Sequence, residues 1–182
     1  MFNKLSVAFS MVLTAMLAFS LQAAEVKTIE WTDLMPEDDL KALMAMPEVA
    51  HDYSQPSPFD DNYNGDDPTA QAWQKILQSA KVKPEYNNVK VKIPGFIVPL
   101  EFDDKQNVTS FFLVPYFGAC IHVPPPPPNQ IIFVTNKQKI KGDMIYSPFW
   151  ISGTLTTESM SHDLAKSAYS MKADKIEEYT YE

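Results

Sequence analysis

The stretch that decides the fold runs from Val89 to Phe102 and reads VKVKIPGFIVPLEF. Apolar residues alternate with lysines before Pro94-Gly95 and resume after it, a pattern typical of a half-buried β-strand. Proline and glycine inside a strand mark a bend or the close approach of another backbone. The stretch therefore predicts one long strand that bends in its middle and serves both sides of a small β-barrel.

Four further segments rich in β-branched and aromatic residues complete this prediction. In the last of them, Tyr169, Met171 and Ile176 can all face inward only if a bulge lies between them. We expect Asn136-Lys137 to form the turn that follows the third strand. The strands that follow the first one are predicted at 109–116, 130–135, 149–157 and 168–178.

The number of strands selects the fold class, which is mainly β (α+β). Five short strands separated by turns predict an OB-like barrel over residues 85–182. An immunoglobulin-like sandwich is the second choice, but it would need about seven strands.

Residues 24–84 form an acidic, turn-rich segment that precedes the barrel. Acidic residues after Pro36, and Pro47 at the other end, predict a helix over 36–46. Its apolar face would be Leu40, Leu43 and Met44. A second helix is predicted over 69–80, and we expect both helices to dock on the barrel as a cap. The apolar face of that second helix would be Ala72, Trp73, Ile76 and Leu77.

The first 23 residues read as a cleavable signal peptide. Lys4 supplies the positive charge, an apolar run extends from Leu5 to Leu21, and Ala23 ends a small-residue cleavage site. A transmembrane anchor is the alternative, but the run is at the lower limit for a membrane span. We therefore expect a periplasmic protein that does not insert into the membrane after cleavage.

Composition excludes several classes of function. The 182 residues include 15 basic side chains, all of them lysine, against 23 acidic ones, for a formal net charge of -8. Without arginine there is no guanidinium clamp for phosphate and no arginine contact to guanine. Net negative charge also disfavours nucleic-acid binding, because that binding needs clustered positive charge.

The most unusual stretch lies between the second and third predicted strands. Residues 114–130 read VPYFGACIHVPPPPPNQ. Cys120 and His122 are two residues apart, so in extended backbone they point to the same face. The five prolines that follow predict a stiff polyproline II rod that holds the Cys-Ile-His segment. We expect the rod to pack on the barrel, and recognition by an aromatic groove of a partner is the alternative.

Three interpretations of Cys120 and His122 stay open. They could bind zinc, which favours thiolate and imidazole, with His162 as a third ligand beside Asp163 and with Glu101 and His51 as further candidates. They could instead be a buried cysteine and a hydrogen-bonded histidine with only a structural role. They could also form a nucleophile and base pair of a thiol-dependent enzyme, although no third orienting residue is evident.

A calcium loop is a weaker hypothesis. Asp60, Asn62 and Asn64 follow the start of an EF-hand loop. Gln71, however, stands where the bidentate glutamate should be, and Pro68 occupies the ninth position. A solvated acidic turn is the favoured interpretation.

At these motifs the chain resembles the domain of unknown function 3299 family of exported bacterial proteins. The resemblance covers roughly residues 85–180 and is most specific in the Cys-Ile-His-Val-polyproline-Asn-Gln string. It implies no settled activity. Family members often accompany ABC-transporter genes and histidine-rich periplasmic metal-binding proteins, so the resemblance implies zinc uptake as a theme and transporter components as partners. Together with the signal peptide and the lack of a complete catalytic constellation, it predicts a periplasmic, non-enzymatic accessory or binding protein. The matching segments are 95–101, 112–122, 124–130 and 150–155.

Overall fold

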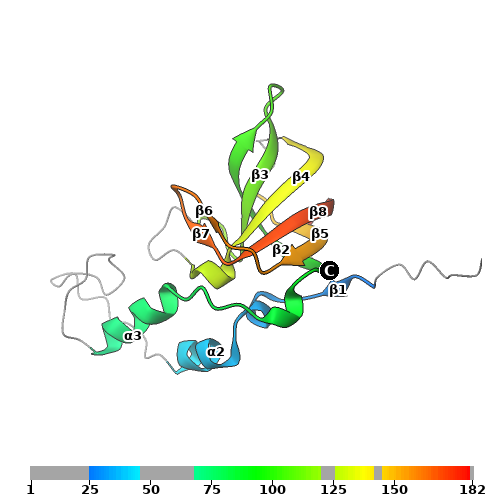
Figure 1. Ribbon diagram of the computed structural model, residues 1–182. Coiled ribbons are helices and arrows are strands. Elements are labelled where there is room, and N and C mark those ends of the chain that lie inside the picture. The colour runs from blue at the N-terminus through cyan, green and yellow to red at the C-terminus, as the bar shows by residue number, and fades with distance from the viewer. Residues whose placement is uncertain (1–24, 46–67, 120–125, 142–144, 181–182) are drawn as a thin grey trace, which may run out of the picture.

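The computed structural model describes residues 25–45, 68–119, 126–141 and 145–180, which form a β-barrel with two short helices near the N-terminus (Figure 1). The strands pair in the order β2-β3-β4-β8-β5, and β5 pairs back onto β2, so the barrel is closed. Among these five strands, every pairing is antiparallel except that between β4 and β8. The predicted mainly β, OB-like barrel is confirmed. Its strands are β2 (Val89–Phe102), β3 (Asn107–Val114), β4 (Ile132–Lys141), β5 (Phe149–Thr156) and β8 (Tyr169–Glu178).

The bend in β2 closes the barrel, as the sequence predicts. Residues Val89 to Gly95 pair with β5, and residues Phe96 to Phe102 pair with β3. At Gly95 the backbone of β3 comes so close that a Cβ atom would lie 2.8 Å from the carbonyl oxygen of Val114. Only glycine fits there, because real Cβ atoms do not approach a backbone oxygen so closely.

Irregularities in two other strands test the finer predictions. The bulge expected in β8 is present, because the pairing with β5 shifts register between Ser152 and Gly153. The turn predicted at Asn136-Lys137 is wrong, since β4 continues to Lys141. The pairing of β4 with β3 changes register there, and the Asn136 side-chain amide donates a hydrogen bond to the carbonyl oxygen of Val108 at 2.9 Å. A turn-forming residue thus serves a bulge inside a strand.

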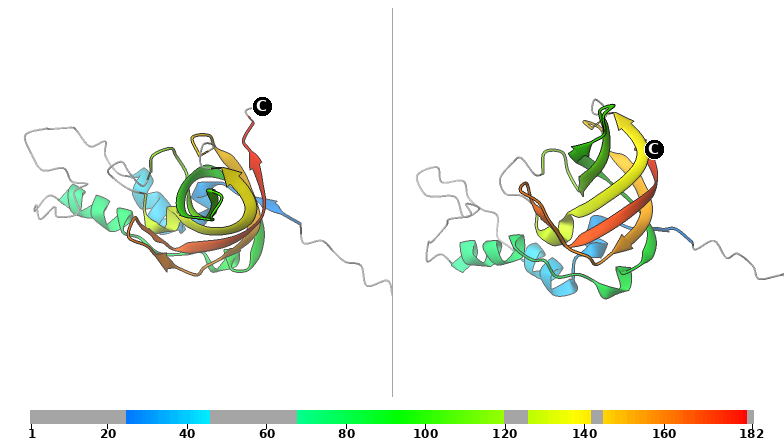
Figure 2. Two further views of the ribbon diagram at one scale, coloured as in Figure 1. Left: turned by 90° about the horizontal axis from the view of Figure 1, so that it is seen from above. Right: turned by 45° about the horizontal axis from the view of Figure 1, so that its top comes forward.

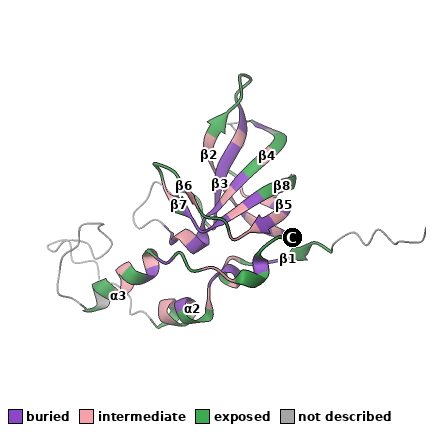
Figure 3. Ribbon diagram, in the orientation of Figure 1, coloured by how far each residue is buried: buried purple, intermediate pink, exposed green. Residues whose placement is uncertain are grey.

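Many residues of the barrel strands are buried (Figure 3). The apolar ones form two clusters on opposite faces of the barrel wall. The larger cluster fills the interior and includes Ile93, Phe111 and Tyr169. The smaller one lies on the outer face of β2, β3 and β4. Its buried members are Phe112, Val114, Ala119 and Ile131, and Phe96, Val98, Leu100, Phe133, Met160 and Ala165 pack against them.

The leading segment packs against the end of the barrel opposite the β2–β3 turn (Figures 1 and 2). Ile29 and Leu34 belong to the interior cluster. The Trp31 indole N–H donates to the carbonyl oxygen of Pro94 at 2.7 Å, which fastens the segment to the bend of β2. The elements of this segment are β1 (Lys27–Thr28), which pairs with β2 in parallel, η1 (Trp31–Leu34), α2 (Glu37–Met44), α3 (Pro68–Leu77) and η2 (Pro84–Tyr86).

The buried hydroxyl of Tyr169 makes a second connection to this segment. It donates to the carbonyl oxygen of Leu34 at 2.9 Å and accepts from the Lys83 N–H at 2.7 Å. Burial raises the pKa of Tyr169 to about 12, so the phenol stays protonated and keeps both bonds at neutral pH. Within the described ranges, no helix has the length and apolar character that crossing a membrane requires.

The prediction of which residues form the buried face of α2 is wrong in part. Met44 is 76% exposed, whereas Asp39 is only 6% exposed. Leu40 and Leu43 are half-buried as expected. The helix therefore turns a carboxylate, rather than a methionine, toward the rest of the molecule.

We predict that Gly95→Ala destabilises the protein by about 1–3 kcal/mol, because the added methyl group would have to displace the backbone of Val114. Urea denaturation of the chain from residue 24 to residue 182 measures the effect. Thr154→Ala, which trims a half-buried side chain elsewhere in the barrel, is the control and should cost less. Equal stability of Gly95→Ala and the wild type would show that the bend does not require a glycine.

Candidate functional site

The Cys-Ile-His-polyproline motif connects β3 to β4. Cys120 and His122 lie outside the described residues, as do residues up to Pro125. Both flanks of the motif are described, and they show how the barrel holds its two ends.

The leading flank ends in the outer apolar cluster. Gly118 adopts a φ of 77°, a conformation that glycine accepts without strain. Ala119, which directly precedes Cys120, is fully buried in the cluster with Phe112 and Val114. The chain therefore enters the motif from a fixed point on the barrel wall.

His162 approaches the same cluster from another part of the chain. It lies in the hairpin of β6 (Met160–Ser161) and β7 (Lys166–Ser167), between β5 and β8. Its exposed ring meets the Phe112 ring edge-on, with centroids 6.1 Å apart. Ala119 and Phe112 belong to one apolar cluster and His162 contacts Phe112, which places the last described residue before Cys120 and the predicted third ligand on one face of the barrel.

A hydrogen bond to the ring of His162 limits how this side chain could bind a metal. Its Nδ1 atom accepts from the Leu164 N–H at 3.2 Å, so a neutral ring carries its proton on Nε2. Coordination of a metal through Nδ1 would replace this bond, and coordination through Nε2 would need the other tautomer. Among the described residues, no group of three or more His, Cys, Asp or Glu could hold a metal ion. A metal site here would therefore depend on Cys120 and His122.

Glu101, a further candidate ligand, has a hydrogen-bond partner of its own. The carboxylate of Glu101, near the end of β2, accepts a hydrogen bond from the Ser110 hydroxyl at 2.8 Å. His51 and the start of the hypothetical calcium loop, from Asp60 to Gly65, lie outside the described residues.

Exposed aromatic rings lie beside the leading flank. Phe117 is 54% exposed and Tyr146 is 69% exposed, and their ring centroids are 6.1 Å apart. Phe117 also meets Phe96 of β2 at 5.9 Å. The surface next to the motif is therefore apolar and accessible.

The trailing flank is buried. Pro126 and Pro127 are both buried, and Pro127 has the φ of -61° and ψ of 153° of a polyproline II residue. The rod ends earlier than predicted, since Pro128 begins the short helix η3 (Pro128–Gln130). The described prolines therefore pack on the protein.

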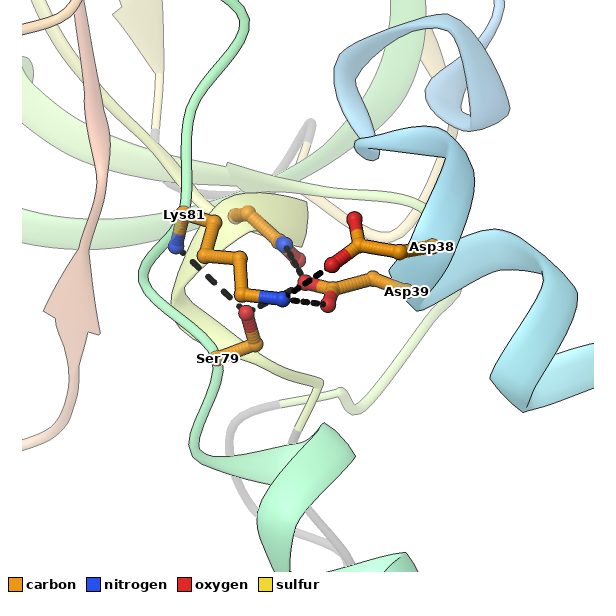
Figure 4. Close-up of polar contacts among 5 residues, drawn as sticks. Asp38, Asp39, Ser79 and Lys81 are labelled. Atoms are coloured by element: carbon orange, nitrogen blue, oxygen red, sulfur yellow. Dashed lines mark hydrogen bonds and ion pairs between the residues drawn. The ribbon is translucent and has the colours of Figure 1, made fainter.

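A buried carboxylate fixes the residue that follows the prolines (Figure 4). Asp39 of α2 accepts hydrogen bonds from the Ser79 hydroxyl, from the Asn129 side-chain amide at 3.2 Å and from Lys81 Nζ at 2.7 Å. Lys81 also donates to Asp38 at 2.6 Å. These bonds raise the pKa of Lys81 and lower that of Asp38. We call this group of five residues the Asp39 cluster.

Three further hydrogen bonds near the Asp39 cluster hold the trailing flank in place. The Asn129 N–H donates to the carbonyl oxygen of Ser79 at 3.2 Å. The Gln130 side-chain amide donates to the carbonyl oxygen of Trp31 at 2.9 Å. The Ala168 N–H donates to the carbonyl oxygen of Pro128 at 2.7 Å. Three separate parts of the chain thus hold the segment from Pro128 to Gln130.

A serine, a carboxylate and a lysine together raise the question of nucleophilic catalysis. Ser79 is only 9% exposed, and both carboxylate oxygens of Asp39 already accept hydrogen bonds. A nucleophile must reach a substrate, and a general base needs a free lone pair directed at it. The geometry therefore fits a clamp that joins α2, the chain after α3 and the trailing flank.

The residues of this clamp do not stand out in the sequence. Asn129 and Gln130 were identified only as part of a motif, and Asp39 only as an acid in the first turn of a helix. The available signal was the Asn-Gln pair itself, because two amides between a proline run and an apolar strand need buried partners.

We predict that Asp39→Asn destabilises the protein by about 1–3 kcal/mol, because a buried carboxylate with three donors is lost. Asp38→Asn is the matched control. It removes an adjacent carboxylate that also binds Lys81 but is 69% exposed, so its effect should stay below about 1 kcal/mol. Chemical denaturation at pH 7 measures both. Equal effects of the two variants would contradict the assignment of Asp39 as the centre of the clamp.

Comparisons with known proteins agree with the resemblance inferred from the motifs. Residues 31–178 match the family described as protein of unknown function (DUF3299). The chain is also similar to a crystal structure of a DUF3299 family protein from Pseudomonas aeruginosa PAO1, with 34% sequence identity and a TM-score of 0.64. That similarity covers 87% of this chain and 99% of the other. No curated protein matches the sequence. The protein therefore belongs to the DUF3299 family.

Proposed function

We propose that this protein is a non-enzymatic binding protein of the periplasm that holds zinc through Cys120, His122 and His162. The thiolate and two imidazoles are the ligand types that zinc prefers. Three protein ligands would leave one position of a tetrahedral ion for water or for a partner's ligand.

One observation carries the proposal. Ala119, which is bonded to Cys120, belongs to the outer apolar cluster, and the ring of His162 contacts Phe112 of the same cluster. The two residues are 43 positions apart in the sequence, yet they lie on one face of the barrel. A metal site assembled there would need only the local placement of Cys120 and His122.

The clamped flanks strengthen this proposal. Ala119 is fully buried on one side of the motif, and Asn129 is fully buried on the other. When both ends of a short segment are fixed, ordering it around a ligand costs less conformational entropy. The Asp39 cluster therefore supports a binding role for the motif without taking part in binding.

The sequence supports the proposed export, and the association of the family with transport genes supports the proposed partners. The signal peptide over residues 1–23 supports a periplasmic location. We include components of an inner-membrane ABC transport system, or a periplasmic metal-binding protein, as the partners that such an accessory protein would serve. The partner would contact the exposed rings of Phe117 and Tyr146 beside the motif.

A zinc titration of the mature chain, residues 24–182, in competition with a chromophoric chelator tests the proposal. We expect one zinc ion per chain. Cys120→Ser and His122→Ala should each weaken binding by about tenfold or more, because each removes a direct ligand. His162→Ala should weaken it in the same direction. His51→Ala is the matched control, since it removes the remaining histidine and should leave the affinity unchanged.

Two results would contradict the proposal. The first is the absence of stoichiometric zinc binding, or equal binding by the wild type and all variants. The second is rapid alkylation of Cys120 by iodoacetamide near neutral pH that is lost in His122→Ala without any zinc binding. That second result would favour the thiol-dependent enzyme, because it reports a thiolate activated by an imidazole.

A further inference from the structure

The barrel wall opens between β4 and β8. Their parallel pairing runs only from Ile132 opposite Tyr169 to Thr135 opposite Lys172. Both strands then continue, β4 to Lys141 and β8 to Glu178. The far edge of β4 pairs with β3 and the far edge of β8 pairs with β5. The two edges that face each other beyond Thr135 and Lys172 are therefore not paired with one another.

A glycine and a bulge explain why β8 leaves β4 at this point. A Cβ atom on Gly153 of β5 would clash with the carbonyl oxygen of Lys172. The register shift next to Gly153 leaves Asp174 of β8 without an opposite residue. A bulge bends its strand and increases its twist, so β8 follows β5 rather than β4. The opening is built into the sequence of two strands.

A groove of about 420 Å³ lies where the strands separate, and its lining includes Thr135, Lys137, Lys172 and Asp174. Asp174 is already paired with Lys90. Lys137 and Lys172 are exposed and form no ion pair with any residue in the described ranges. The groove is thus locally positive in a chain whose formal net charge is -8.

The side chain of Asn136 adds a second property that a ligand of the groove would have to match. Its amide N–H₂ donates to Val108, which fixes which end of the side chain is the oxygen. Asn136 lines the groove, and its Oδ1 atom is buried and accepts no hydrogen bond from the described residues. A buried acceptor without a donor is unfavourable, so an N–H group of a ligand would satisfy it if the side chain turned toward the groove. A simple anion such as phosphate has acceptors for the lysines but none of the N–H donors of a peptide.

We propose that this groove binds an extended, acidic segment of a partner polypeptide, which adds a strand between β4 and β8. Such a segment brings backbone N–H and C=O groups for the two facing edges and carboxylates for Lys137 and Lys172. Recognition of peptides by strand addition at an exposed sheet edge is a recurring mode of binding. Lysines on the edge also repel the same edge of a second copy, which favours a different partner over self-association.

Fluorescence anisotropy of the mature chain with a labelled heptapeptide of alternating valine and glutamate tests the proposal. We expect saturable binding that the double variant Lys137→Glu/Lys172→Glu weakens by at least about tenfold, since two attractive contacts become repulsive. The matched control is Lys105→Glu/Lys166→Glu, which makes the same charge change away from the groove and should weaken binding far less. A peptide with lysine in place of glutamate should not bind.

A heptapeptide with N-methylated backbone amides separates strand addition from simple charge attraction. It keeps the carboxylates but loses the backbone donors, so its affinity should fall by about tenfold or more. Equal binding of the methylated peptide, or complete competition by inorganic phosphate at the peptide's own concentration, would overturn the proposal. It would also be overturned if the peptide failed to bind and the wild type formed a dimer that Lys137→Glu/Lys172→Glu dissociates, because the occupant would then be a second copy.

Discussion

The shared strand β2 is the constraint on which the rest of the structure depends. One strand has to pair with β5 before Gly95 and with β3 after it, and the backbone of Val114 leaves room at that point only for a hydrogen atom. Along this strand one row of side chains points inward and the alternate row lies on the outer wall, where it packs against the cluster that includes Phe112. It also exposes the carbonyl oxygen of Pro94 to the indole of Trp31. Barrel closure, the outer cluster and the attachment of the leading segment therefore share one cause.

The leading segment is part of the folded barrel domain, because its side chains pack in the barrel interior. Ile29 and Leu34 fill part of the interior core, and Asp39 reaches across to the residue that follows the proline run. A carboxylate in such a buried position is tolerated only when its oxygens are hydrogen-bonded, so Asp39 and its donors have to form together. In this way a helix near the N-terminus sets the position of a motif ninety residues later in the chain.

Much of the fold could be predicted from local pattern. Alternation predicted the five barrel strands, Pro94-Gly95 predicted the bend, and the spacing of Met171 and Ile176 predicted the bulge in β8. The failures have one physical origin, which is that the partner of a polar residue cannot be seen in a local window. Asn136 looked like a turn residue but bonds to Val108, and Asp39 looked like a helix-start acid but bonds to Asn129. The placement of His162 beside Phe112 likewise depends on how β6 and β7 fold over the wall.

The proposed function depends on whether the thiolate of Cys120, which lies between these two fixed flanks, binds zinc. The chain has a single cysteine, so a sulfur atom in the coordination shell would point to Cys120. X-ray absorption spectroscopy of the zinc-loaded chain of residues 24–182 measures this directly. The proposed zinc site predicts one sulfur at about 2.3 Å and imidazole nitrogens at about 2.0–2.1 Å from the metal. A shell of oxygen and nitrogen alone, without sulfur, would contradict it.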